Sequence, residues 1–383
     1  MATEISRKQK ASIFSSGKRK VDVAFLSLVL VLLTIGLVML FSASYVYSYT
    51  HYDNSFRFIF NQAKYAAVGL IFMFIASRID YHFYRKFAWI ILIISVALLG
   101  FLLVVPPMVA GMDVKRWFAI GSFSFQPSEI AKFAIILIFS HLIAANYKLM
   151  GKFKFIAVLV FILGIVCILV IAEPHISATL LIGIIGVVLM IIGGLKLPYI
   201  LGGLGIGVGG ASVVLLSGAI SYSSDRIQYW LDPWADATGL GYQTIQSLLA
   251  IGSGGIMGRG LGNSRQKYLW VPEPHNDFIF SIVCEELGLI GALIIILLFC
   301  ALVWRGFTIA LKAPDKFGCL LAVGLTFQVG LQAILNILVV TNTLPNTGIS
   351  LPFFSYGGTS LILLLSQMGI VLSISREANL KKL

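Results

Sequence analysis

Trp270-Val-Pro-Glu-Pro-His-Asn-Asp277 ends a long polar loop, roughly 217–275, and leads directly into the apolar run 277–304. Asp277 therefore lies where water is expected to meet hydrocarbon. The other ionisable residues just before it are Arg259, Arg265, Lys267, Glu273 and His275. Charged groups at such a depth are costly, so this junction is a candidate functional site.

The composition around this junction is that of a membrane protein. Of 383 residues, 58% are hydrophobic and 11% are charged, which excludes an ordinary soluble domain. The net charge of +12 does not indicate nucleic-acid binding, because the charges are dispersed among apolar segments. The four cysteines form no Cys-x-x-Cys pair, so neither a disulfide framework nor a metal site is predicted.

Ten apolar segments are long enough to cross a membrane, since a spanning helix needs ~20 residues. They are 22–44, 58–77, 87–106, 128–145, 154–172, 177–193, 199–216, 277–304, 318–341 and 358–375. We therefore expect an all-α polytopic protein with about ten transmembrane helices and one large extracellular loop between spans 7 and 8. Residues 22–375 form its transmembrane domain, and 1–21 and 376–383 are tails. The first span is read as a signal anchor and not as a cleavable signal sequence.

The basic residues predict the orientation of the chain. An even number of spans places both termini on one side, and most of the 28 basic residues lie in the tails and in the loops of that side. The positive-inside rule then places both termini in the cytoplasm and the loop 217–275 outside.

A second outer segment, Gln126-Pro-Ser-Glu129, precedes the fourth span. Ser128 is predicted to cap the helix that follows, and Glu129 lies where the helix dipole favours an anion. Glu129 and Lys132 are three residues apart and hence neighbours on one helical face. The pair either fastens a loop to a helix or helps to orient Asp277; both interpretations stay open.

Three further outer segments carry less specific signals. Residues 173–179 are predicted to form a short turn in which His175 is solvated. The glycine-rich stretch 252–267 suits anion binding but fits no nucleotide motif, and an ordinary solvated loop remains an alternative. Residues 341–360 contain two prolines and several glycines, which exclude a regular helix, so this segment is expected to fold against protein at the membrane edge.

Asp277 has no carboxylate partner on its own helix. Glu285 and Glu286 lie eight and nine residues further on, and the helical rise and turn place both away from Asp277. They are interpreted as polar contacts within the bundle. A lone carboxylate among cations suits general-base catalysis or ion binding.

These segments together resemble the SEDS family of FtsW, RodA and SpoVE proteins, most closely the FtsW/SpoVE branch. The resemblance covers nearly the whole chain. Its motifs are Arg116-Trp, Gln126-Pro-Ser-Glu129 with Lys132, Gly241-Tyr-Gln243, Gln246-Ser247, the stretch Gly258 to Lys267, Pro272 to Phe280 and Pro352-Phe-Phe-Ser-Tyr-Gly-Gly358.

The resemblance implies a peptidoglycan glycosyltransferase in a bacterial cytoplasmic membrane. Such enzymes polymerise lipid II into glycan strands beside a class B penicillin-binding protein, in division, elongation or sporulation. It implies Asp277 as the catalytic residue and Glu129 with Lys132 as a supporting ion pair. The expected substrate- or diphosphate-binding residues are Arg116, Gln126, Ser128, Arg259, Arg265, Lys267, His275, Ser355 and Tyr356. It implies no organic cofactor and no nucleic acid, and leaves a divalent cation open.

One stretch departs from the family pattern. Where the family has Pro-Asp-x-Gly-Thr, this chain reads Pro174-His-Ile-Ser-Ala-Thr179. A role assigned to that aspartate therefore does not carry over. Two other functions remain as alternatives: a transporter of a lipid-linked precursor, and a scaffold for a partner enzyme.

Overall fold

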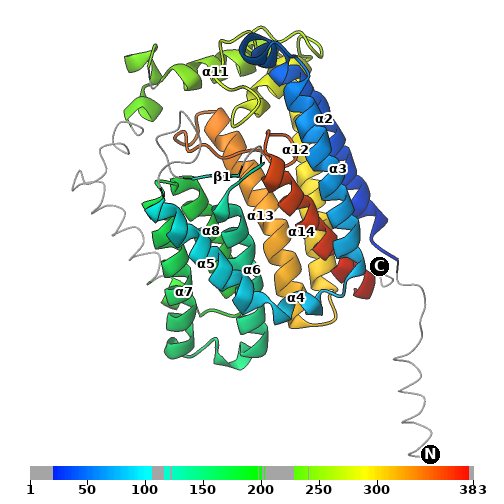
Figure 1. Ribbon diagram of the computed structural model, residues 1–383, viewed down its shortest axis with the longest axis vertical. Helices are drawn as coiled ribbons and strands as arrows, with labels where there is room; N and C mark the ends of the chain where they lie inside the picture. The colour runs from blue at the N-terminus through cyan, green and yellow to red at the C-terminus, as the bar shows by residue number, and fades with distance from the viewer. Residues whose placement is uncertain are drawn as a thin grey trace, which may run out of the picture.

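The computed structural model describes residues 20–105, 116–120, 123–196, 198–200, 202, 228–239 and 241–378. Long apolar helices form a bundle, and the short helix α11 (Tyr242–Gly254) with its neighbouring loops covers one end of it (Figure 1). The long helices are α2 (Val23–Tyr52), α3 (Arg57–Arg78), α5 (Ala88–Val104), α6 (Pro127–Ala145), α7 (Phe153–Ala172), α8 (Ile176–Ile192), α12 (Ile279–Leu311), α13 (Lys316–Val340) and α14 (Gly358–Glu377). The short ones are α4 (His82–Lys86), η1 (Tyr147–Leu149), η2 (Pro233–Asp236) and α11 (Tyr242–Gly254).

These helices confirm the predicted all-α polytopic fold. Within the described residues, seven helices are long and apolar enough to cross a membrane, and α5 and α8 are apolar but shorter, with 17 residues each. Each of these nine corresponds to one predicted span. The predicted span 199–216 lies almost entirely outside the described residues, so the count of ten is not confirmed.

The span in α12 begins later than predicted. Gly288 interrupts the helix with φ +67°, and the chain at Gly258 packs against this kink so closely that a Cβ there would lie 2.3 Å from the Glu286 carbonyl oxygen. Helical residues before the kink are covered by protein, whereas Leu289 is 55% exposed. The lipid-facing part of this span therefore begins near Leu289 and not at residue 277, because the polar loop wraps the start of the helix.

Helices α3 and α14 pack side by side along their lengths, with α2 next to them (Figure 1). Gly369 permits this close approach, since a Cβ at this position would lie 2.4 Å from the Met73 carbonyl oxygen. The backbone N–H of Asp22 donates to Ser375 Oγ at 3.0 Å. The first and last described helices therefore have their terminal ends on the same face of the bundle, as an even number of spans requires.

Two outer segments are not helical. The strands β1 (Phe118–Ile120) and β2 (Phe123–Phe125) form an antiparallel pair that the sequence analysis did not predict. The Phe118 and Phe125 rings stack at 5.2 Å across it. Residues 341–357 contain no regular helix, as predicted, and their apolar side chains Leu351 and Phe354 are buried.

Candidate active site

Asp277 lies two residues before α12, in a cavity of about 180 Å³ at the end of the bundle away from the termini. Several segments that are distant in the sequence meet here: the approach to β1, the α7–α8 turn, α11, and the non-helical loop 341–357. The lining residues are Arg116, Pro174, Ile176, Ser177, Gln243, Asp277, Asn346, Thr347 and Gly348. The described part of the lining therefore has one carboxylate, one guanidinium and several neutral polar groups.

Backbone carbonyl groups hold Arg116 at this cavity. Its Nε donates to the Glu173 carbonyl oxygen at 3.4 Å, and its Nη2 donates to the carbonyl oxygen of Pro174. The neighbouring Ser177 hydroxyl donates to the carbonyl oxygen of Thr347. The α7–α8 turn thus connects the arginine on one side of the cavity to the loop on the other.

The Asp277 carboxylate is partly exposed and accepts no hydrogen bond from any residue in the described part of the chain. Its backbone, in contrast, is fixed: Asn336 Nδ2 donates to the Asp277 carbonyl oxygen at 2.7 Å and to the Ile349 carbonyl oxygen at 2.6 Å. Gly348, with φ +69°, lies so close that a Cβ there would be 3.2 Å from Asp277 Oδ2. The carboxylate is held in place but is left without a donor.

The electrostatic surroundings make Asp277 a stronger base than an ordinary aspartate. Burial among protein atoms, and to a smaller degree the Glu273 carboxylate, raises its pKa to about 6, while Arg116 acts to lower it. A carboxylate with this pKa is still ionised at neutral pH. It is therefore suited to accept a proton from a substrate hydroxyl group.

A second buried carboxyl group borders this site. The Glu173 side chain is fully buried, and neither of its oxygens has a hydrogen-bond partner in the described part of the chain. Burial raises the pKa of Glu173 to about 8, although Arg116 opposes this shift. Glu173 is therefore largely protonated at neutral pH.

Ser355 and Tyr356 support the segment that carries Asp277. The Ser355 hydroxyl donates to the Asn276 carbonyl oxygen at 2.8 Å, and the Tyr356 N–H donates to the His275 carbonyl oxygen at 2.9 Å. The His275 ring is buried between aromatic rings, 4.8 Å from Tyr47 and 4.3 Å from Phe58. Burial lowers the pKa of His275 to about 4, so it is neutral. None of these three residues lines the Asp277 cavity.

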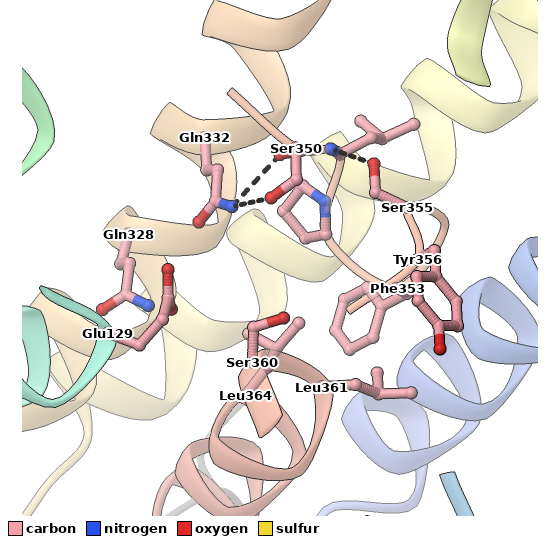
Figure 2. Close-up of a pocket in the computed structure, with 12 residues that line it drawn as sticks. Glu129, Gln328, Gln332, Ser350, Phe353, Ser355, Tyr356, Ser360, Leu361 and Leu364 are labelled. Carbon is pink, nitrogen blue, oxygen red and sulfur yellow. Dashed lines mark hydrogen bonds between the residues drawn. The ribbon is translucent and has the colours of Figure 1, made fainter. Parts of the chain in front are cut away.

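The predicted ion pair is present on α6, where Lys132 Nζ lies 2.7 Å from Glu129 Oε1. Lys132 is almost fully buried. Glu129 lines a separate cavity of about 30 Å³, together with Gln328 and Gln332 of α13 and with Ser355 and Tyr356 (Figure 2). Figure 2 shows Gln332 directed at Ser350 and Gln328 beside Glu129. The pair therefore lies next to the loop 341–357 and not in the cavity that Asp277 lines.

Two local predictions near this pair were wrong. Helix α6 begins at Pro127 with Gln126 as the capping residue, so Ser128 is not the cap but lies in the first turn. His175 is not simply solvated, because its ring Nδ1 lies 3.3 Å from Gln126 Nε2 and 3.4 Å from Ser128 Oγ. Burial lowers the pKa of His175 to about 3, so it packs as a neutral ring against the start of α6.

The cations of the glycine-rich stretch lie elsewhere, around the two glutamates of α12. Lys267 is buried, and its Nζ lies 3.1 Å from Glu286 Oε1. The Arg259 Nε lies 3.7 Å from Glu285 Oε1, and the backbone N–H of Arg265 donates to the same oxygen at 2.9 Å. Of the four predicted cations, Arg116 alone lines the Asp277 cavity.

Several residues of the site were missed by the sequence analysis. They are Glu173, Ser177, Gln243, Asn336, Asn346, Thr347 and Gly348. One of them had a readable signal: Gln328, Gln332 and Asn336 recur every four residues within an apolar span, which predicts a polar stripe on one helical face. The others lie on separate segments, among them the starts of α8 and α11, whose approach to Asp277 the sequence does not indicate.

The described residues contain no group of three or more histidine, cysteine, aspartate or glutamate side chains that could hold a metal ion. Asp277, which lines the cavity, and Glu173, which borders it, do not form such a group. The expectation about a divalent cation stays a prediction.

The sequence is similar to known proteins over nearly its whole length. A family model named for FtsW, RodA and SpoVE and described as a cell cycle protein matches residues 23–380. Stage V sporulation protein E of Bacillus subtilis (strain 168) is 40% identical, over 94% of this chain and 98% of that protein. A probable peptidoglycan glycosyltransferase FtsW of Geobacter sp. (strain M18) is 38% identical, over 92% of this chain and 96% of that protein.

Solved structures share the fold. A chain from a peptidoglycan synthase complex, studied for the structural coordination of polymerization and crosslinking, is 25% identical with a TM-score of 0.75, covering 93% of this chain and 98% of that chain. The rod shape determining protein RodA of Thermus thermophilus is 24% identical with a TM-score of 0.70, covering 94% of this chain and 98% of that chain. The latter likeness concerns the fold alone.

Proposed function

This chain belongs to the FtsW/RodA/SpoVE family, and from that premise we propose that it is a peptidoglycan glycosyltransferase that polymerises lipid II at the outer face of the bacterial cytoplasmic membrane. Relatives named as probable peptidoglycan glycosyltransferases align with more than nine-tenths of the chain. The transmembrane helices supply apolar surfaces for the isoprenoid tails of donor and acceptor. The cavity at Asp277 is the site where the sugars react.

In the proposed reaction, Asp277 acts as the general base. Its carboxylate takes the proton from the acceptor sugar hydroxyl while the hydroxyl oxygen bonds to the anomeric carbon of the donor. The bond between that carbon and the diphosphate breaks, and undecaprenyl diphosphate leaves with the electron pair. The proton on Asp277 then passes to water, which restores the carboxylate.

Arg116 is proposed to stabilise the charge that develops on the leaving diphosphate. Among the described residues it is the cation that lines the cavity, and the carbonyl groups of residues 173 and 174 fix its position. A positioned cation in a site with limited water access stabilises developing negative charge more strongly than the same cation in solution. Arg259 and Lys267 have no such role in this proposal, because Glu285 and Glu286 neutralise them.

The observation that carries the proposal is the state of the Asp277 carboxylate. It lies in a polar cavity opposite a guanidinium, its pKa is raised to about 6, and no donor in the described part of the chain occupies it. A carboxylate that only stabilises the fold is normally hydrogen-bonded. An ionised carboxylate without a donor is available to a substrate hydroxyl.

The test is polymerisation of purified lipid II by the purified full chain, with Asp277→Asn as the variant. We expect glycan synthesis to fall by ~10²–10⁴-fold, the usual contribution of a general base. The matched control is Glu273→Gln, the same chemical change at an exposed carboxylate nearby. It is expected to keep near-normal activity at pH 7.5. Glycan strands of normal yield from Asp277→Asn would exclude the general-base role of Asp277, whereas no glycan synthesis by the wild-type chain would favour a scaffold or a transporter.

Two further parts of the proposal are tested in the same assay, and a third is tested by chemical labelling. We propose a class B penicillin-binding protein as partner, since the similar solved chain is part of a peptidoglycan synthase complex; the assay is run with and without it. No organic cofactor is required by the proposed chemistry, and reactions with and without Mg²⁺ determine whether a divalent cation assists the diphosphate. Cysteine labelling of the tails from either side of the membrane tests whether both termini are cytoplasmic.

A further inference from the structure

The face of the bundle that carries both chain ends has a cavity of about 660 Å³, between the ends of α2, α3 and α14. Most of its lining is apolar: Val23, Leu26, Met73, Phe74 and Leu372. Val23 and Phe74 are exposed, so the cavity opens toward the surroundings of the bundle. In a membrane, an opening of this kind is filled by hydrocarbon.

Three cations lie at the rim of this cavity, one from each helix end. Lys20 precedes α2, Arg78 is the last residue of α3, and Arg376 lies in the last turn of α14. Arg376 Nη1 donates to the Ser77 carbonyl oxygen at 3.1 Å, and the Arg78 guanidinium lies 4.7 Å from the centre of the Phe74 ring. The basic groups therefore lie at the rim, above the apolar lining.

Helix capping accounts for two of these cations but not for the third. Arg78 and Arg376 lie at helix C-termini, where the helix dipole favours positive charge. Lys20 lies at the N-terminal end of α2, where the dipole disfavours it. A negatively charged ligand at this rim would explain a lysine at that position.

Two nearby carboxylates of the described residues, Asp22 and Asp80, are already bound by other basic groups. Asp22 is bound by Arg305, with Nη2 and Oδ2 2.7 Å apart, and Asp80 lies 2.7 Å from His82 Nδ1. Glu377 follows Arg376 but does not line the cavity. The tail that precedes Lys20, residues 1–19, contains five basic side chains and one acidic one. Its charge has the same sign as the rim, which makes the tail an unfavourable occupant.

We propose that this cavity binds an anionic glycerophospholipid of the leaflet that faces the termini, with one acyl chain along α2, α3 and α14 and its phosphate between Lys20 and Arg78. Basic pockets between transmembrane helices on the cytoplasmic side are suited to anionic lipid head groups. The apolar lining and the basic rim together match a lipid, whereas a free phosphate would leave the hydrocarbon surface unfilled. This inference does not depend on the proposed glycosyltransferase activity.

The test uses the delipidated full chain in detergent, titrated with phosphatidylglycerol or with phosphatidylcholine of the same acyl chains, and counts bound lipids by native mass spectrometry. Wild type is expected to retain one phosphatidylglycerol in preference to phosphatidylcholine. The double variant Lys20→Gln/Arg78→Gln is expected to bind phosphatidylglycerol roughly 20- to 30-fold more weakly, from about fivefold per cation removed.

The control is Lys148→Gln/Lys152→Gln, which removes the same charge from the η1–α7 connection. It is expected to bind phosphatidylglycerol as wild type does. If the rim variant does not fold, Val23→Trp fills the cavity without changing the charge and is expected to abolish retention. Wild-type retention by either cavity variant overturns the proposal, as does stronger binding of undecaprenyl phosphate than of phosphatidylglycerol.

Discussion

Near the start of α12, two groups of carboxylates differ in whether they have hydrogen-bond partners. Glu285 and Glu286 are fully buried, and each of their oxygens has a partner: Ser264 Oγ donates to Glu285 Oε2, and Lys267 Nζ donates to Glu286 Oε1. Asp277, eight residues earlier, has no donor among the described residues and faces a cavity. The satisfied pair fastens the polar loop to the helix, whereas the unsatisfied carboxylate remains free to act on a substrate. At the start of α12, the structural carboxylates have hydrogen-bond partners and the candidate catalytic carboxylate has none among the described residues.

The largest effect on stability is expected from removing a partner of the buried pair Glu285 and Glu286. Lys267→Met leaves Glu286 buried without its cation, which typically costs about 3–5 kcal/mol of folding free energy. Asp277→Asn removes no pairing and is expected to leave the unfolding temperature in detergent unchanged or slightly raised. Thermal unfolding of the two variants measures the difference. Equal losses in both would show that the distinction between the two carboxylate groups is wrong.

The next prediction tests whether activity requires open space next to the Asp277 carboxylate. In Gly348→Ala the new methyl group meets Asp277 Oδ2 at 3.2 Å, and left-handed backbone costs a non-glycine residue about 1–2 kcal/mol. We expect lipid II polymerisation to fall by roughly tenfold, which corresponds to 1.4 kcal/mol of transition-state stabilisation. Gly262→Ala is the matched control, since Gly262 has φ +80° but no atom within contact of a new Cβ. It is expected to lose stability without losing activity.

A smaller effect is expected in the pH dependence. Because the pKa of Asp277 is about 6, polymerisation is expected to fall as pH decreases through 6, where the base becomes protonated. Glu273 helps to raise this pKa, so Glu273→Gln is expected to move the acid limb to lower pH. Glu273→Asp keeps the charge and is expected to keep the limb in place. If Glu273→Gln does not shift the pH at which polymerisation falls, the group that titrates is not Asp277.

The smallest effect is expected at Glu173. With a pKa of about 8, its carboxyl group is mostly neutral at pH 7, and Glu173→Gln is expected to change activity there by less than about twofold. Because the pKa of Glu173 in the folded state lies above its ordinary value, the protonated carboxyl group contributes to folding stability. This contribution is fully present below about pH 4 and is lost as pH rises through 8. Unfolding temperatures measured from pH 5 to 9 are therefore expected to decline more in wild type than in Glu173→Gln.

The sequence predicted the helices well because hydrocarbon imposes a length and an apolar composition that can be read directly. The boundaries of α6 and α14 fall within two residues of the expected spans 128–145 and 358–375. The prediction failed where folding of a loop decides the outcome. The glycine-rich stretch returns to α12, which buries Lys267 and moves the start of the lipid-facing span to Leu289.

The same limit explains the partial prediction of the site. Asp277 and Glu129 with Lys132 could be singled out because charges near hydrocarbon are conspicuous in a sequence. Gly348 lies in the loop 341–357 and Ser177 in the first turn of α8, and both come close to Asp277 only after three distant segments have met. Asn336 is intermediate, since the four-residue spacing of polar groups on α13 indicates a buried stripe but not what it holds.

The unequal helix lengths have a consequence for the lipid around the protein. At 1.5 Å per residue, the 30 residues of α2 extend about 45 Å, but the 17 residues of α8 extend only about 25 Å, less than the roughly 30 Å of a typical hydrocarbon core. A bilayer becomes thinner next to a transmembrane helix whose apolar surface is shorter than the hydrocarbon core. Ile176 and Ser177, at the start of α8, line the Asp277 cavity. Local thinning on that side would bring the lipid head groups closer to the candidate catalytic carboxylate, and a lipid-linked sugar could then reach it from the side of the bundle.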